Sequence, residues 1–256
     1  MLSYRKLAMR VLGRPLHTEG IDSPRPASQR AAALVLTAAM LTTLAAPAFA
    51  KTWYIENGNI TVKAGKIEGT NKVSQGETTD EKDTDTVITN RDKDTASSHT
   101  VTIDAKDKDD KVEVTLKDVN IDASSGSEAA VSVTGKGDTT IELDGDNELK
   151  SGAGHAGLEH NKTDTSGELT IQDKDNNGSL EAAGGFKGAG IGSAGSNDAQ
   201  VKITGGNITA TSDDWGAGIG SGSYGTGTVE ITGGEINATG GYLGAGIGGG
   251  CNGSGN

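Results

Sequence analysis

Gly188-Ala189-Gly190-Ile191-Gly192 is a short sequence that occurs three times in the second half of the chain. It returns at Gly216–Gly220 and at Gly244–Gly248, so the same step of about 28 residues separates successive copies. A fixed period of about 20 to 50 residues is typical of stacked repeats, because a single repeat of that size cannot bury its apolar face alone. The sequence therefore predicts a solenoid.

Each repeat contains three short apolar stretches separated by glycine pairs. In the last repeat the stretches are Val229-Glu230-Ile231, Ile236-Asn237-Ala238 and Ala245-Gly246-Ile247. Alternation of apolar and polar residues is typical of a strand, and the pairs Gly233-Gly234 and Gly240-Gly241 suit the backbone angles of tight corners. We predict an all-β fold, a right-handed parallel β-helix in which each turn, or coil, has about 28 residues and three short strands.

The period extends backwards beyond the obvious copies. Pairs of aliphatic residues recur in the first strand of five coils, at nearly constant steps apart from one longer step. Side chains two residues apart in a strand point to the same side, so each pair is expected to face the interior, as are Ile191, Ile219 and Ile247 of the third strands. The pairs are Val114 and Leu116, Ile141 and Leu143, Leu169 and Ile171, Val201 and Ile203, and Val229 and Ile231.

Residues 1–50 differ in composition from the rest of the chain. A lead rich in basic residues precedes the apolar stretch 31–47, and Ala48-Phe49-Ala50 follows it. A basic region, an apolar region and a small-x-small sequence together indicate a secretory signal peptide that is cleaved after Ala50. The alternative, a membrane anchor, is disfavoured because the apolar stretch is short for a span. We therefore expect a secreted, extracellular protein at the cell surface, and bacterial export is the simplest origin.

The charge and the cysteine content exclude several classes of protein. The net charge is −12, and residues 1–50 carry six basic and two acidic residues, so the remainder carries −16. An acidic protein is repelled by nucleic acid and by anionic membranes, so neither is an expected partner. Cys251 is the single cysteine, so a disulfide-stapled scaffold is excluded.

The remainder of the chain divides into two parts. Residues 51–110 are predicted to be an irregular N-terminal part of the solenoid that acts as a cap, because terminal repeats are usually atypical. Residues 111–256 hold the β-helix repeats. Cys251–Asn256 matches the loop that precedes a further strand, so we expect the repeats to be truncated at the C-terminus. An uncapped last coil would expose unpaired backbone groups, which favours end-to-end self-association.

A family resemblance is carried by three features. They are the stretches VTLKDVNIDASSGSEAAVSVTG (114–135) and TTIELDGDNELKSGAGHAGLEHN (139–161), and the ITGG…GAGIG repeats. The chain from Trp53 onward resembles a group of secreted bacterial carbohydrate-binding β-helix proteins, which are similar in fold to polysaccharide lyases. The resemblance implies a parallel β-helix, a polysaccharide of plant cell walls or of a host as partner, and calcium as a structural ion.

One insertion suggests where calcium would bind. The longer step, from Leu169 to Val201, contains the stretch Asp173-Lys174-Asp175-Asn176-Asn177-Gly178. Oxygen ligands on alternate residues before a turn glycine are typical of the first half of a calcium loop, and hard oxygen ligands suit Ca²⁺. Asp173, Asp175 and Asn177 are the candidate ligands, with Glu181 as an additional carboxylate. The alternative is a polar loop that bulges from a strand corner.

The few aromatic residues indicate a second candidate site. Phe186 and Tyr242 each lie two residues before a GAGIG sequence, and Trp215 lies one residue before. Stacked coils would bring the three rings to one exposed corner, where flat apolar rings suit the C–H faces of sugars, with Asp213, Asp214 and Asn207 available to sugar hydroxyls. The alternative is that the rings merely cover glycine-rich corners.

Catalysis finds little support in the sequence. His155 and His160 have no companions at a zinc-binding spacing and are interpreted as parts of a solvated loop. Lyases of this fold need calcium-binding acids beside a basic residue, and Arg91 is the single arginine after residue 50. No catalytic triad or paired carboxylates can be assigned from spacing, and a fold alone does not establish an activity.

These features favour one function over two alternatives. We expect a secreted, non-catalytic polysaccharide-binding or adhesin-like surface module. The first alternative is a structural stalk or self-assembling surface element, and the second is a degenerate polysaccharide lyase. Binding to glycans separates the first two functions, and release of unsaturated sugars from pectin would identify the third.

Overall fold

The computed structural model describes residues 50–256, whose regular secondary structure is almost entirely β-strand. The signal peptide predicted for residues 1–50 lies outside the described residues except for Ala50, which is exposed. The described residues belong to one compact unit. In the part of the chain that the structure describes, no helix is long and apolar enough to cross a membrane.

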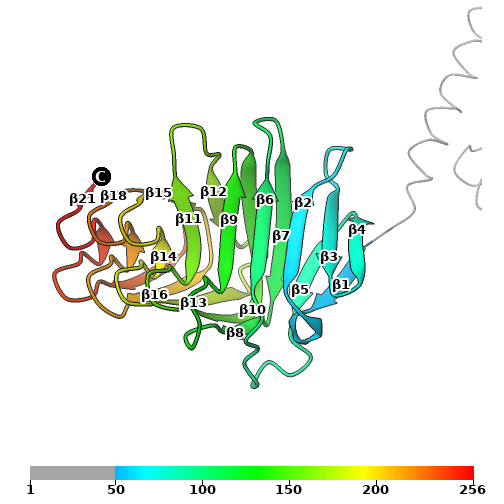
Figure 1. The fold of residues 1–256 in the computed structure, drawn as a ribbon, viewed down its shortest axis with the longest axis horizontal. Helices are drawn as coiled ribbons and strands as arrows, with labels where there is room; N and C mark the ends of the chain where they lie inside the picture. The colour runs from blue at the N-terminus through cyan, green and yellow to red at the C-terminus, as the bar shows by residue number, and fades with distance from the viewer. Residues whose placement is uncertain (1–49) are drawn as a thin grey trace, which may run out of the picture. The chain divides into compact units, whose positions relative to one another are not determined.

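Three parallel sheets form the walls of the β-helix, and Figure 1 shows their strands stacked from the N-terminal to the C-terminal end. Sheet A contains, in spatial order, β1 (Lys51–Tyr54), β5 (Thr86–Thr89), β7 (Lys111–Lys117), the first half of β10 (Asp138–Lys150), β12 (Leu169–Gln172), β15 (Asp198–Ile203), β18 (Thr226–Ile231) and β21 (Ser254–Gly255).

Sheets B and C complete each coil. Sheet B contains β4 (Thr78–Asp83), β3 (Asn71–Gln75), β2 (Ile60–Ala64), β6 (Val101–Ala105), β9 (Val131–Gly135), β11 (Leu158–Lys162), β14 (Ile191–Gly192), β17 (Ile219–Gly220) and β20 (Ile247–Gly248). Sheet C contains β8 (Asn120–Asp122), the second half of β10, β13 (Gly178–Gly184), β16 (Asn207–Ser212) and β19 (Glu235–Thr239). A single 3-10 turn, η1 (Ile55–Asn57), follows β1.

The strand register confirms the predicted period. Val201 pairs with Val229 in sheet A, Ile208 pairs with Ile236 in sheet C, and Ile219 pairs with Ile247 in sheet B. Each pair joins residues that lie one repeat apart in the sequence, so identical side chains stack in successive coils. The fold is therefore a parallel β-helix whose three-stranded coils have about 28 residues each.

The repeated glycines are required by close contacts between coils. Gly220 has a φ of +132°, and a Cβ atom there would lie 2.0 Å from the carbonyl oxygen of Gly248. A Cβ atom on Gly216 would likewise lie 2.0 Å from the carbonyl oxygen of Gly188. Only glycine permits both this backbone angle and this approach. The GAGIG sequence is thus a steric requirement of the corners next to sheet B.

The predicted aliphatic pairs line the interior. Every pair from Val114 and Leu116 to Val201 and Ile203 is buried, and so are Ile191 and Ile219. The last coil differs, because Ile231 is 37% exposed and Ile247 is 48% exposed. In the described residues β19 and β20 pair only with the preceding coil, and β18 pairs with β21 only at Thr226 and Gly227. The apolar side chains of the last coil are therefore covered mainly on one side.

The N-terminal end combines parallel coils with an antiparallel hairpin. The parallel register already includes β1 with β5 and β2 with β6. The strands β3 and β4 then add to the outer edge of β2 in antiparallel orientation. Trp53, in β1, is buried. Its indole Nε1 donates a hydrogen bond of 2.7 Å to the carboxylate of Asp83 at the end of β4.

Candidate functional site

Phe186 and Trp215 meet at the corner between sheets C and B. Phe186 lies in the connection from β13 to β14, and Trp215 lies in the corresponding connection from β16 to β17. Their ring centroids are 5.3 Å apart, with an angle of 42° between the ring planes. Phe186 is 41% exposed and Trp215 is half-buried. The structure therefore brings together two of the three aromatic residues singled out in the sequence.

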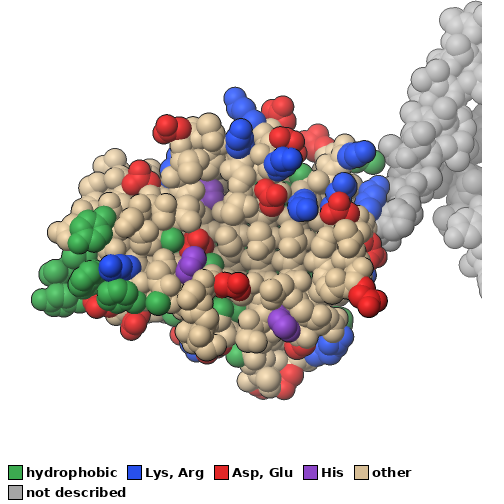
Figure 2. All heavy atoms as spheres, in the orientation of Figure 1, with side chains coloured by type: hydrophobic (Ala, Val, Ile, Leu, Met, Phe, Trp, Pro, Cys, Tyr) green, Lys and Arg blue, Asp and Glu red, His purple; other side chains and the backbone are tan. Residues whose placement is uncertain are grey.

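The third residue, Tyr242, lies in the connection from β19 to β20 and is 70% exposed. Among the residues that the structure describes, its ring contacts no other aromatic ring. Its neighbour Leu243 is 67% exposed. Figure 2 shows exposed hydrophobic side chains gathered at the C-terminal end of the β-helix, at the left of the view. We call Phe186, Trp215, Tyr242 and Leu243 the apolar corner.

The backbone explains why Trp215 is one residue out of phase with the other two rings. Lys187, Trp215 and Leu243 occupy the same place in successive coils and have φ angles of +72°, +65° and +63°. Phe186 and Tyr242 each lie one residue before this left-handed position. In the coil between them, Asp214 lies at that preceding place and Trp215 takes the left-handed position itself. Such angles cost bulky residues about 1–2 kcal/mol, so the folded corner has to hold Trp215 in this conformation.

Hydrogen bonds between coils fix these corner residues. The backbone N–H of Lys187 donates to the carbonyl of Asp214 at 2.8 Å, and its own carbonyl accepts from Ser223 at 3.0 Å. The carbonyl of Trp215 accepts a hydrogen bond of 2.7 Å from Cys251 of the next coil. The backbone at Lys187 and Trp215 is therefore tied to the neighbouring coils.

Lys187 is a member of the site that sequence reasoning missed. Its Nζ atom lies 5.2 Å from the ring centroid of Phe186 and 5.2 Å from that of Trp215. A cation at this distance is attracted by the negative face of an aromatic ring. The sequence did contain a signal for this residue. Lys187 lies one full repeat before Trp215, and residues in the same phase of the repeat share a corner.

The polar residues expected beside the rings are only partly in place. Asp213 is exposed and Asp214 is half-buried, with Oδ1 buried and without a hydrogen-bond donor. Asn207 is at the start of β16, whereas the corner follows the end of this strand. A strand of that length spans about 16 Å, so Asn207 lies well away from the rings.

The candidate calcium ligands do not form a common cage. Both carboxylate oxygens of Asp173 accept backbone hydrogen bonds, from Asn177 at 3.1 Å and from Gly178 at 3.0 Å. The side-chain amide of Asn177 donates to Asp144, Asp175 is exposed, and Glu181 lies on β13 in a separate hollow. In residues 50–256 no three His, Cys, Asp or Glu side chains are placed to hold a metal ion. These residues do not fit the predicted calcium site, and Asp173 instead closes the turn before β13.

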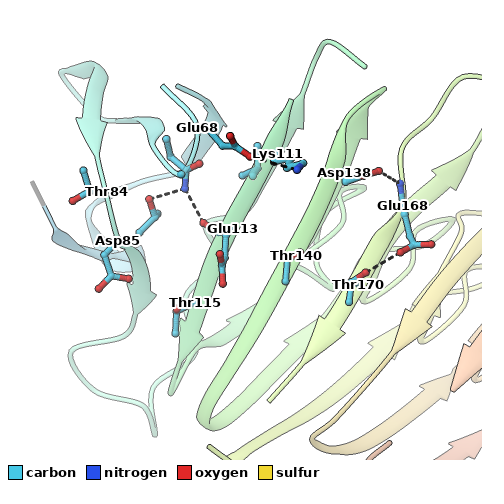
Figure 3. Close-up of a pocket in the computed structure, with 14 residues that line it drawn as sticks. Glu68, Thr84, Asp85, Lys111, Glu113, Thr115, Asp138, Thr140, Glu168 and Thr170 are labelled. Atoms are coloured by element: carbon cyan, nitrogen blue, oxygen red, sulfur yellow. Dashed lines mark hydrogen bonds and ion pairs between the residues drawn. The ribbon is translucent and has the colours of Figure 1, made fainter. Parts of the chain in front are cut away.

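A polar groove runs along the outer face of sheet A, as Figure 3 shows. It has a volume of about 580 Å³. Strands β7, β10 and β12 form its floor, and the loops before β3 and β5 form one wall. The charged and hydroxyl side chains that line it are Glu68, Thr84, Asp85, Thr86, Lys111, Glu113, Thr115, Asp138, Thr140, Glu168 and Thr170.

Most of the groove carboxylates already have partners. Lys111 lies 3.5 Å from Glu68, and Lys174 lies 2.8 Å from Glu113, a contact that raises the pKa of Lys174. Asp138 accepts a hydrogen bond of 3.0 Å from the backbone of Glu168. The groove contains no aromatic ring. It offers hydrogen-bonding groups without an apolar platform. Sequence reasoning missed it because its residues come from five separate segments.

The interpretation of His155 and His160 as parts of a solvated loop is wrong for His160, whereas His155 does lie in the connection before β11 and is half-buried. His160 belongs to β11, is buried, and has Nδ1 3.3 Å from the carbonyl oxygen of Gln200. Burial lowers the pKa of His160. The buried carboxylate of Glu159 contacts Nδ1 of His155 at 2.8 Å and accepts hydrogen bonds from Ala156 and Asn161. The Glu159 carboxylate thus connects the corner before β11 to the strand itself through hydrogen bonds.

Comparison with known proteins agrees with this geometry. A family model described as a β-helix repeat matches residues 201–223 and 229–251. The two stretches are the coils that carry Trp215 and Tyr242. No curated protein and no solved structure matches the chain. The chain therefore contains a β-helix repeat, a fold consistent with a surface or binding module.

Proposed function

We propose that this protein is a secreted, non-catalytic module that binds polysaccharide at the apolar corner. The observation that carries the proposal is the contact between the rings of Phe186 and Trp215 at an exposed corner of adjacent coils. Two adjacent rings provide an apolar surface that can accept the C–H faces of successive sugars. Aromatic residues also lose little conformational entropy on binding, because they have few rotatable bonds.

The hydrogen bonds of the corner backbone support binding rather than mere coverage of the glycine-rich turns. The Trp215 carbonyl is held by Cys251, and the Lys187 carbonyl is held by Ser223. A surface that is ordered before the ligand arrives loses less freedom when the ligand binds. Lys187 adds a positive charge beside both rings, which suits polysaccharides that contain acidic sugars.

The experiment is a binding screen of the exported protein against neutral and acidic polysaccharides of plant cell walls and of animal surfaces. We expect retention by at least one class, with binding that is lost when Phe186 and Trp215 are both replaced by alanine. The matched control is Ile67→Ala, since Ile67 is an exposed apolar residue in the loop between β2 and β3. A wild-type protein that binds nothing in the screen favours the structural stalk.

A further inference from the structure

Asp83 is a buried carboxylate at the N-terminal end of the β-helix. Its exposed fraction is 0%. Oδ2 accepts the 2.7 Å hydrogen bond from the indole of Trp53. Oδ1 accepts hydrogen bonds from two backbone N–H groups, those of Lys51 at 3.2 Å and Asp85 at 3.1 Å. The carboxylate thus has three donors, all of them neutral in the uncleaved chain.

The ion pairs of the antiparallel hairpin join lysines to two other carboxylates, those of Glu81 and Asp80. The side chain of Lys51, in β1, points to another carboxylate. Its Nζ atom lies 2.7 Å from Glu81 and 4.1 Å from the ring centroid of Trp53. The three neutral donors replace part of the hydration that this buried carboxylate of Asp83 loses, so a cation added beside it would stabilise it further.

Processing can supply a cation beside Asp83. The predicted cleavage after Ala50 hydrolyses the Ala50–Lys51 peptide bond. Water supplies the hydroxyl group of the new Ala50 carboxylate, and the backbone nitrogen of Lys51 becomes an α-amino group that is protonated at neutral pH. This nitrogen is the atom that already lies 3.2 Å from Asp83. Ala50 is exposed, so an export protease could reach the bond in the folded chain as well.

We propose that cleavage after Ala50 creates an ion pair between the α-ammonium of Lys51 and the buried carboxylate of Asp83. The pair joins the first residue of β1 to the last residue of β4. It therefore fastens the antiparallel hairpin onto the first coil of the described residues. The N-terminal end becomes more stable in the processed protein than in its precursor.

The test compares two chains that differ by one residue. One begins at Lys51 and the other retains Ala50 as its first residue, and both end at Asn256. The described residues belong to one compact unit, so both chains are expected to fold. In the longer chain the Lys51 nitrogen remains a neutral amide donor, and the charge is displaced by one residue. We expect the chain that begins at Lys51 to melt about 2–4 °C higher, the shift that corresponds to about 1 kcal/mol for a domain of this size.

The Asp83→Asn variant of both chains supplies the control. Asparagine retains an acceptor but has no charge, so the difference in melting temperature between the two chains should disappear. If Asp83→Asn fails to fold, the comparison of the two wild-type chains still decides the question. Equal melting temperatures in that comparison, or an exported protein whose N-terminal residue is not Lys51, would overturn the proposal.

Discussion

The ring of Phe186 lies against the ring of Trp215, with 5.3 Å between centroids, although the two residues belong to different coils. Trp215 reaches this position through a left-handed backbone conformation that Lys187 and Leu243 share in the neighbouring coils. The contact arises from the stacking of coils, because Trp215 lies one repeat after Lys187 at the same corner, and Phe186 directly precedes Lys187.

Removing the larger ring should separate binding from stability. We expect Trp215→Ala to weaken polysaccharide binding about tenfold, equivalent to about 1.4 kcal/mol, because half of the ring pair is lost. Trp215→Gly should weaken binding equally, and its backbone adopts the positive φ without strain. Isothermal titration and thermal unfolding of both variants provide the measurements. A large loss of stability in Trp215→Gly with unchanged affinity would show that the ring only covers the corner.

The stacked interior should not tolerate a charge. Ile219 is fully buried between Ile191 and Ile247 of the adjacent coils. Ile219→Asp places an unpaired carboxylate there, which we expect to cost about 4 kcal/mol of unfolding free energy. Denaturant unfolding followed by circular dichroism measures the change. Ile67→Asp introduces the same side chain at an exposed position and should leave the unfolding midpoint nearly unchanged.

The loop at Asp173 should depend on its hydrogen bonds rather than on a metal ion. Asp173→Ala removes the acceptor of two backbone N–H groups, so we expect a loss of about 1–3 kcal/mol of stability. The loss should be the same in calcium and in chelator, and Asp175→Ala should have little effect because Asp175 is exposed. A calcium-dependent rise in melting temperature that Asp175→Ala abolishes would restore the calcium site.

His160 should make the protein less stable in mild acid. Burial lowers its pKa in the folded state, whereas the unfolded chain keeps a pKa near 6.5. The unfolded state therefore binds the proton more tightly, and the unfolding free energy should fall as the pH decreases below about 6.5. We expect His160→Gln to flatten this dependence between about pH 6.5 and 5, as measured by denaturant unfolding. His99→Gln, at a half-buried position, is the comparison variant that should retain the slope.

Much of the fold was predictable because the sequence repeats. The constant step of the repeat places Ile191, Ile219 and Ile247 in one phase, and parallel strands stack residues of one phase directly above each other. The repeated glycines carry the same information, because a Cβ atom at Gly216 would collide with the coil below. Both features are local and periodic, so they can be read without knowledge of the folded chain.

The side-chain contacts of the candidate sites could not be predicted from the repeat period alone. The sequence alone determined a parallel β-helix with apolar rings near one corner, since periodicity governs which residues face inward and which corners coincide. Only the tertiary structure showed that Lys187 lies beside two rings, that Asp173 closes a turn, and that Asp83 receives the backbone nitrogen of Lys51. The physical reason is that hydrogen bonds and ring contacts act over a few ångströms, so they depend on the side-chain and backbone geometry that only the folded chain defines.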